Sequence, residues 1–383
     1  MELFNGPTFT FKDIGLQFLG NLLSYFISKE ENPQKITIIV ATSGDTGSSA
    51  IKAIEASDWL DIYVLYPGFN RISELQERQM ATSQSKNVHC VRMDGTSDDG
   101  DVVIHYLFSN QSFREKMRLT TLNSINIARI LVQICHFFFS YIHHYADEII
   151  HLDSTAPLPL IRYAIPSGGL GNSTSCFVAK KMNLPISKLV LGVNENNCLH
   201  NLFNNGFFET TPISVSIAPA IDISNPYNIE RYIYYIFNQN YERIKQWMED
   251  TNTKAYLNEE DLVELNSFAT VFKISSEEIV EKIKEFYSSF GYFLDPHTAV
   301  GVAALVRKLE TEPDGDYIPT ICLATAHPAK FPETIEKTVS AQVPIPDSLK
   351  SLYELPLRFI DFPASEMASW GEKLLKIMEE NYA

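Results

Sequence analysis

The sequence predicts an α/β protein built on parallel sheets. Apolar runs of strand length, rich in β-branched residues, alternate with segments of helical periodicity, and two of these runs end in glycine-rich turns that open a helix. Strands covered by helices on both faces read as continuous apolar runs. We therefore expect the chemistry in the loops that follow the carboxyl ends of the strands.

The expected elements follow one another along the chain. The strands are Lys35–Ala41, Asp61–Tyr66, Val88–Met93, Tyr163–Ile165, Leu189–Val193 and Ile318–Ala324. The helices are Ile14–Ser28, Thr46–Ala56, Ser73–Thr82, Leu122–Tyr145 and Asn172–Met182. Prolines in 146–159 indicate a connection between domains, 225–290 is expected to be mostly helical, and a strand followed by a helix over 364–380 is expected in a peripheral C-terminal segment.

Composition narrows the class of protein. The 383 residues carry 31 Lys and Arg against 47 Asp and Glu, a formal net charge of −16, which disfavours binding to nucleic acid or to anionic membranes. No apolar run is long enough for a membrane span, and the first residues do not resemble a signal peptide. Five dispersed cysteines indicate reduced thiols, so we expect a cytoplasmic protein, with secretion as the weaker alternative.

Lys12 is the first candidate for chemistry. It lies between aromatic residues and an expected helix start, in the segment Phe9–Asp13. Shielding from water and a nearby helix N-terminus both disfavour an ammonium group and expose a nucleophilic amine. A lysine that forms a Schiff base needs such surroundings, although a solvated surface lysine is the commoner reading of one residue.

Two glycine-rich turns are the next candidates. Ala41–Ser48 (ATSGDTGS) offers hydroxyls and backbone N–H groups at a helix start, and Pro166–Ser173 (PSGGLGNS) has three glycines in four positions. Both suit an anion, although either alone is also an ordinary strand-to-helix connection. A Schiff-base lysine together with two anion loops matches the needs of pyridoxal phosphate, which requires an amine, a phosphate site and a second site for an amino-acid carboxylate.

The chain resembles the threonine synthase family of fold type II pyridoxal-phosphate enzymes. The segments that carry the resemblance run in the family's order to about residue 340, and the beginning MELF, the stretch PLPL and IDISNPYNIER are most similar to the threonine synthase-like 2 branch. The matching segments are GPTFTFKD, ATSGDTGSSA, RISELQERQM, LNSINIARILVQ, IPSGGLGN, AKKMNLPISKLVLGVNENNCLH, AIDISNPYNIER, DPHTAV and ATAHPAKF.

The resemblance implies roles for individual residues. Lys12 matches the Schiff-base lysine, and Thr325 matches the hydroxyl expected near the pyridine nitrogen. The cofactor-phosphate loop is matched by Gly168, Gly169, Leu170, Gly171 and Asn172. The loop that receives the substrate carboxylate is matched by Ser43, Gly44, Asp45 and Thr46, and the substrate-phosphate site by Asn123, Ser124 and Arg129.

The resemblance also implies an architecture of two parallel-sheet α/β domains with the cofactor in the cleft between them. Residues 1–150 would form a small α/β domain and part of the large one, 151–345 the large cofactor-binding domain with a helical insertion at about 225–290, and 346–383 the peripheral segment. Family members carry a sizeable segment before the lysine motif, so we expect a supporting N-terminal part to be missing here.

The expected activity is elimination of phosphate from O-phosphothreonine or O-phosphohomoserine, giving 2-oxobutyrate and ammonia. The family's phosphate loop usually reads GNFG, whereas Gly169 here lacks the asparagine side chain, and this departure together with the branch resemblance favours the lyase outcome. Threonine synthesis, or a non-catalytic relative that acts through protein contacts, are the alternatives. A binding-only role towards a phosphorylated ligand is weaker.

Several histidines and one lysine remain without a role. Adjacent His143 and His144, with His151, lack a partner at ligand spacing, so no metal site is expected. His297 and His327 lie in family motifs beside prolines and receive no proton-transfer role. Lys330 is compatible either with an anion contact or with solvent exposure. The sequence does not indicate an oligomeric state.

Overall fold

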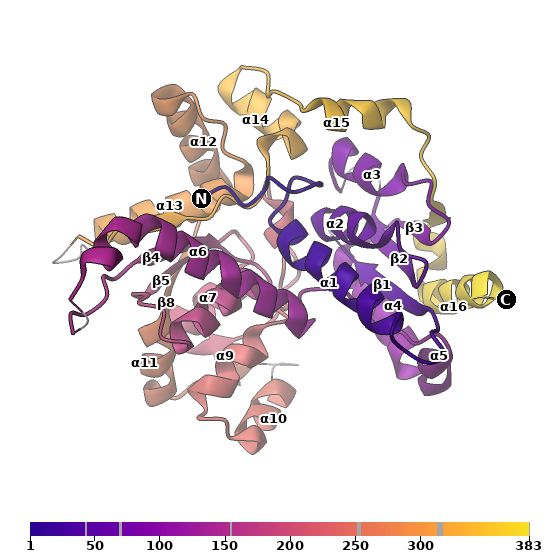
Figure 1. The fold of residues 1–383 in the computed structure, drawn as a ribbon, viewed down its shortest axis with the longest axis horizontal. Coiled ribbons are helices and arrows are strands. Elements are labelled where there is room, and N and C mark those ends of the chain that lie inside the picture. The colour runs from indigo at the N-terminus through magenta and orange to yellow at the C-terminus, as the bar shows by residue number, and fades with distance from the viewer. Residues whose placement is uncertain (43, 69–70, 154, 251–253, 312–316, 383) are drawn as a thin grey trace. The chain divides into compact units, whose positions relative to one another are not determined.

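A computed structural model describes the whole chain except residues 43, 69–70, 154, 251–253, 312–316 and 383. The chain forms two compact units. The lysine unit comprises residues 4–129 and 344–383, and the glycine-loop unit comprises residues 1–3 and 130–343 (Figure 1). The domain limits expected at about residues 151 and 346 stay a prediction.

The lysine unit is built on a four-stranded sheet in the order β1-β2-β3-β10, with every pairing parallel. Ile38 lies opposite Ile62, and Leu65 opposite Val91, which fixes the register. The strands are β1 (Ile36–Ala41), β2 (Leu60–Pro67), β3 (Val88–Met93) and β10 (Ile360–Phe362). The α-helices are α1 (Lys12–Ile27), α2 (Asp45–Ile54), α3 (Glu74–Ala81), α4 (Ser97–Ser109), α5 (Gln111–Lys116), α15 (Asp347–Lys350) and α16 (Trp370–Tyr382), with 3₁₀ turns at Ser351–Glu354 and Ala364–Ser369.

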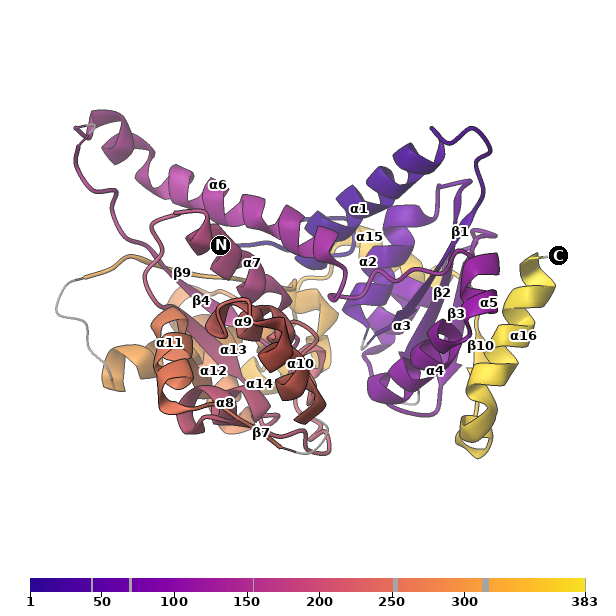
Figure 2. The same ribbon diagram turned by 90° about the horizontal axis from the view of Figure 1, so that it is seen from below.

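Alternate residues of these strands enter two different cores, as the period of two in a strand requires. Ile38 and Val40 pack with side chains of α1 and α2, including Leu16 and Ile51. Ile39, on the same strand, packs on the other face with side chains of α4 and α16, among them Trp370. Figure 2 shows α16 beside β10. The sheet is therefore covered on both faces, as the apolar runs predicted.

The glycine-loop unit is built on a second parallel sheet in the order β8-β5-β4-β9. Its strands are β4 (Arg162–Pro166), β5 (Leu189–Val193), β8 (Ala269–Lys273) and β9 (Thr320–Cys322), and β6 (Phe207–Phe208) pairs separately with β7 (Ala255–Tyr256). The α-helices are α6 (Ile127–His151, residues 127–129 lying in the lysine unit), α7 (Gly171–Lys181), α8 (Cys198–Asn205), α9 (Ile229–Ile236), α10 (Tyr241–Asp250), α11 (Glu259–Phe268), α12 (Ser276–Phe290), α13 (Pro296–Thr311) and α14 (Pro332–Val339), with 3₁₀ turns at Pro219–Ile221 and Pro328–Lys330.

Close packing positions α13 on this sheet. A Cβ on Gly192 of β5 would lie 2.6 Å from the carbonyl oxygen of Val300, so only glycine allows the helix to approach this closely. The first residues of the chain extend the same sheet: the Met1 amino group donates to the Cys322 carbonyl at 2.7 Å, and Leu3 N–H donates to the Ala324 carbonyl at 2.9 Å. Thr325 therefore follows a segment that is held on both sides.

The structure confirms the type and order of all six expected strands and of the five expected helices, and it confirms the C-terminal strand and helix. The limits of two elements were wrong. The strand expected at 318–324 is only Thr320–Cys322, and the helix expected at 122–145 runs from Ile127 to His151. The region 225–290 is mostly helical, as expected, and it also contributes strand β8 to the main sheet, which was not expected. Within the described residues, none of the helices has both the length and the apolar character needed to cross a bilayer.

Candidate active site

Lys12 is the first residue of α1 and is held by the turn before it. Phe9 has a φ of 61°, and its N–H donates to the Gly6 carbonyl at 3.2 Å. The Lys12 side chain is 14% exposed, and its Nζ lies 5.6 Å from the centre of the Phe11 ring. The expected shielding by an aromatic residue at a helix start is therefore present.

Asp13 fixes this turn to the helices around it. Its carboxylate is buried and accepts hydrogen bonds from the N–H and the hydroxyl of Thr8, at 2.8 and 2.5 Å, and from the Ser49 hydroxyl of α2 at 2.6 Å. A Cβ on Gly6 would lie 2.5 Å from an Asp13 oxygen. The residue next to Lys12 thus joins the preceding turn, α1 and α2.

Asp45 gives Lys12 a partner that the sequence did not predict. The Lys12 Nζ lies 3.6 Å from Asp45 Oδ2, and this carboxylate, which is 3% exposed, also accepts from Gln76 Nε2 at 3.0 Å. A neighbouring carboxylate stabilises the ammonium form, opposing the effects of burial and of the helix N-terminus. A carboxylate also repels a substrate carboxylate, so the Asp45 side chain is better suited to orient Lys12.

The rest of the ATSGDTG loop is shaped by the Thr42 hydroxyl. This oxygen accepts from the N–H groups of Gly44 at 3.0 Å and Gly47 at 3.2 Å. Gly44 has a φ of 124°, which favours glycine, and Thr46 is half-buried in the first turn of α2. Ser43, the remaining residue expected in the carboxylate loop, lies outside the described residues.

Arg129 is a buried cation beside α1. It is 3% exposed, and a Cβ on Gly15 would lie 3.5 Å from its Cα. Its Nη1 donates to the Leu122 carbonyl at 2.9 Å, while its Nε has no hydrogen-bond partner among the described residues. Burial lowers the pKa of Arg129 to about 10. A desolvated guanidinium with an unused donor suits an anion.

Asn123 and Ser124 lie in the loop before Arg129. The amide of Asn123 donates from Nδ2 to the Ala41 carbonyl at 2.9 Å, and its oxygen accepts from the Thr121 hydroxyl at 3.1 Å. This side chain therefore ties the loop to the end of β1. Ser124, the next residue, is half-buried.

The glycine-rich loop Ser167–Leu170 joins β4 to α7. Leu170 adopts a left-handed conformation with a φ of 59°, and α7 begins without a side-chain cap. The backbone N–H groups of a first helical turn have no partner within the helix. An anion at this loop would meet these donors together with the positive end of the helix dipole.

Asn172 adds a side-chain donor to this helix start. It is 6% exposed, its Oδ1 lies 3.0 Å from His136 Nε2, and its Nδ2 has no partner among the described residues. Burial lowers the pKa of His136 to about 4, so the neutral ring donates to Asn172 and leaves the amide nitrogen available. A buried donor without a partner at an uncapped helix start fits a bound phosphate.

Thr325 follows β9 in the glycine-loop unit. It is 6% exposed, and its N–H donates to the Thr298 hydroxyl at 3.2 Å. Lys330, for which sequence left two readings open, is fully buried, so the solvent-exposed reading was wrong. Within the described residues, His, Cys, Asp and Glu side chains form no cluster able to hold a metal ion.

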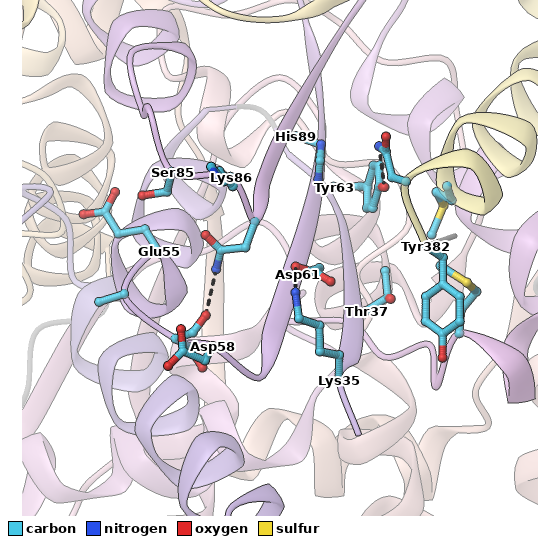
Figure 3. Close-up of a pocket in the computed structure, with 16 residues that line it drawn as sticks. Lys35, Thr37, Glu55, Asp58, Asp61, Tyr63, Ser85, Lys86, His89 and Tyr382 are labelled. Carbon is cyan, nitrogen blue, oxygen red and sulfur yellow. Dashed lines mark hydrogen bonds and ion pairs between the residues drawn. The ribbon is translucent and has the colours of Figure 1, made fainter. Parts of the chain in front are cut away.

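A cavity of about 580 Å³ lies elsewhere in the lysine unit, at the amino ends of β1, β2 and β3. Figure 3 shows the Lys35–Asp61 ion pair, at 3.2 Å, and the stacked rings of Tyr63 and His89, whose centres are 4.4 Å apart. None of the expected site residues lines it. The expected loops follow the carboxyl ends of strands, so this cavity is distinct from them.

Sequence reasoning missed the residues that hold the expected site in shape. Among them are Asp13, Gln76, His136 and Asn228, the last of which donates from Nδ2 to the Gly169 carbonyl at 2.9 Å. Most lie in segments that carried the family resemblance, but a single sequence does not reveal which of its polar side chains are buried.

Comparisons with known proteins bear on these assignments. The family model described as "Pyridoxal-phosphate dependent enzyme" matches residues 1–322, and "Threonine synthase, C-terminal" matches residues 298–370. The chain is 35% identical to threonine synthase of Schizosaccharomyces pombe, over 89% of this chain and 70% of the relative, and 36% identical to threonine synthase-like 2 of Xenopus laevis, over 92% and 72%. The solved structure of pyridoxal-phosphate-bound threonine synthase from Brucella melitensis superposes with a TM-score of 0.85 at 30% identity, covering 98% of this chain and 77% of that one.

Proposed function

Because the chain belongs to the threonine synthase family of pyridoxal-phosphate-dependent enzymes, we propose that it eliminates phosphate from O-phosphothreonine, O-phosphohomoserine or both, giving 2-oxobutyrate, ammonia and phosphate. The fold is that of a fold type II enzyme, and the cofactor is pyridoxal 5′-phosphate. Substrate, product and the roles of individual residues form the proposal.

The residues present fit the cofactor. The amine of Lys12 would hold its aldehyde, the uncapped start of α7 with Asn172 Nδ2 would hold its phosphate, and the Thr325 hydroxyl would meet the pyridine nitrogen. When bound, this cofactor draws electrons from the substrate and makes the proton on Cα acidic. A hydroxyl partner, unlike a carboxylate, does not keep the ring nitrogen protonated and so limits that electron withdrawal.

Residues of the lysine unit would transfer the proton and bind the substrate. With the cofactor bound, the Lys12 amine would take the proton from the substrate Cα, and Asp45, 3.6 Å from the Nζ, would orient that amine. Arg129 binds the substrate phosphate. Its guanidinium is buried, and its Nε has no hydrogen-bond partner among the described residues, so an anion would offset the cost of burying the charge. The first turn of α2, which begins directly after Gly44, receives the substrate carboxylate.

The proposed reaction balances. O-phosphothreonine loses a Cα proton and its β-phosphate to give a four-carbon enamine, which takes up one water and yields 2-oxobutyrate and ammonia. O-phosphohomoserine requires a second proton loss, from Cβ, before its γ-phosphate departs. Addition of water at Cβ would instead give threonine.

The observation that carries the proposal is Arg129, a buried guanidinium with an unused Nε beside the helix that begins at Lys12. A phosphorylated substrate supplies the anion that this group lacks. The lyase outcome is favoured over threonine synthesis by Gly169, which lacks the asparagine side chain usual in the family's phosphate loop. The several relatives named threonine synthase keep that synthesis as the second candidate.

Product analysis separates the two candidates. Protein loaded with pyridoxal phosphate is incubated with each substrate, and 2-oxobutyrate, threonine and phosphate are quantified. K12A should lose turnover, whereas K35A, which changes a half-exposed lysine at the opposite end of β1, should retain it. Threonine as the main product would overturn the lyase assignment.

Cofactor binding separates an enzyme from a non-catalytic relative. The purified wild-type protein should absorb visible light after incubation with pyridoxal phosphate, and borohydride should fix the label on Lys12. A colourless protein that takes up no label would support the non-catalytic reading.

A further inference from the structure

The DPHTAV segment contains a buried carboxylate whose hydrogen bonds extend in two directions. Asp295 is 1% exposed and precedes α13. Its Oδ1 accepts from the N–H and the Nδ1 of His297, both at 2.9 Å, and its Oδ2 accepts from the N–H of Thr298 at 3.3 Å and from the Thr298 hydroxyl. The backbone bonds alone are those of a helix cap, but the two side-chain bonds lead further.

His297 leads from Asp295 towards the glycine-rich loop. Its Nε2 accepts the N–H of Ala220 at 3.0 Å, so its Nδ1 carries the proton donated to Asp295 and the ring is neutral. Ala220 lies in the 3₁₀ turn Pro219–Ile221. A Cβ on Gly168 would lie 2.8 Å from the Cα of Ile221, so the backbone of the glycine-rich loop rests directly on this turn.

Thr298 leads from Asp295 towards Thr325. Its hydroxyl donates to the carboxylate and accepts the N–H of Thr325 at 3.2 Å. Because the hydroxyl proton is engaged by Asp295, the oxygen is oriented as an acceptor. The position of the Thr325 backbone is thereby set from α13.

We infer that Asp295 is a positioning residue that holds the glycine-rich loop and Thr325 in register through His297 and Thr298. The inference rests on the proposed function, in which that loop binds the cofactor phosphate and Thr325 meets the ring nitrogen. These two groups belong to one rigid molecule, so their sites must keep a fixed separation. The Asp295 carboxylate supplies that constraint, because it is hydrogen-bonded through His297 towards the loop and through Thr298 to Thr325.

The hydrogen bonds through His297 and those through Thr298 can be removed separately by substitution. H297N retains a donor to Asp295, because the Asn Nδ2 occupies the place of the histidine Nδ1, but it removes the acceptor for Ala220 N–H. T298V removes the hydroxyl and keeps the shape, whereas T298S restores the hydroxyl. The measurements are the affinities for pyridoxal phosphate and for pyridoxal, which lacks the phosphate, and the absorbance and fluorescence spectra of the bound forms.

H297N should weaken pyridoxal phosphate by up to about tenfold, the loss expected for one hydrogen bond, and leave pyridoxal within about twofold of the wild type. T298V should change the bound-state spectra and weaken both ligands, and T298S should restore both properties. D295N should combine the two effects. If D295N does not fold, H297N and T298V still distinguish a positioning role of Asp295 from a purely capping one.

A purely capping role for Asp295 makes a different prediction. H297N and T298V would then change the melting temperature alone, with ligand affinities and spectra equal to those of the wild type, and that result overturns the inference while leaving the proposed function intact. Wild-type protein that binds neither pyridoxal phosphate nor pyridoxal would overturn both.

Discussion

Replacing Arg129 by methionine should stabilise the ligand-free protein while abolishing phosphate recognition. Arg129 is 3% exposed, its Nε has no partner among the described residues, and burial lowers its pKa to about 10. This value lies well below the ordinary pKa of a guanidinium, and each pKa unit corresponds to about 1.36 kcal/mol. Keeping this group charged in the folded state therefore costs on the order of 3 kcal/mol at neutral pH.

The net effect is smaller because Arg129 also makes one useful contact. Losing the hydrogen bond from Nη1 to the Leu122 carbonyl costs about 1 kcal/mol, which leaves a gain of roughly 2 kcal/mol for R129M. Methionine is flexible enough to occupy the stem of the arginine. For a unit of this size the gain corresponds to an increase of about 4–8 °C in melting temperature.

Melting temperatures are first compared without ligand. Inorganic phosphate is then added to protein loaded with pyridoxal phosphate, so that the phosphate site proposed at the start of α7 is already filled. Phosphate should raise the melting temperature of the wild type, because a ligand of the native state stabilises it, and should leave R129M unchanged. R118M is the matched control, because Arg118 is 30% exposed and pairs with Glu30 at 2.8 Å. Its loss should change stability by no more than about 1 kcal/mol. An R129M protein that melts lower than R118M, or that still responds to phosphate, would refute the reasoning.

Three further predictions test other parts of the two units. Burial lowers the pKa of His136 to about 4, so the unfolded state binds more protons below the ordinary value near 6.5, and the free energy of unfolding should fall by up to about 3 kcal/mol between those pH values. H136Q, which keeps a donor to Asn172, should remove this loss in urea titrations at pH 7 and pH 4.5, and an equal loss in both proteins would contradict it. G168A should weaken pyridoxal phosphate by about tenfold or more, because its Cβ would overlap the Ile221 backbone, and an unchanged affinity in an absorbance titration would show that the turn yields. D13N should lower the free energy of unfolding by about 1–3 kcal/mol, because a carboxylate that accepts from Thr8 and Ser49 becomes an amide with one acceptor, and denaturant unfolding measures the change.

The sheets were predictable because their signal is local. The expected limits of β5 matched the observed strand residue for residue, since a strand buried on both faces contains little but apolar residues. Strand β8 (ATVFK) escaped prediction because it follows directly on α11, with no turn residue between them. Its pairing with β5 is a long-range contact that no local pattern records.

The site was predictable to a different extent. Each glycine-rich loop, and the lysine motif, is an uninterrupted segment of the sequence, so its residues could be named from the sequence alone. The partner of Lys12 could not be named from the sequence. Asp45 is expected there in an anion-binding loop, whereas its carboxylate lies 3.6 Å from the Lys12 Nζ. The hydrogen bonds of Asp295 likewise lead through His297 to Ala220, 75 positions away, and through Thr298 to Thr325, 30 positions away. Only the fold brings these residues together.

Residues outside the loop fix the backbone around Gly169. Gly169 has no amide to stabilise its own loop, yet the buried Asn228 donates to its carbonyl at 2.9 Å from a segment 59 residues later. On the other side, Gly168 rests on Ile221, and Leu170 accepts bonds from the hydroxyls of Ser173 and Thr174, at 3.0 and 2.7 Å. The backbone shape that presents N–H groups to an anion is therefore imposed by neighbouring residues. If this loop holds the phosphate of the cofactor, as we propose, the absence of a side chain at Gly169 should weaken that binding little.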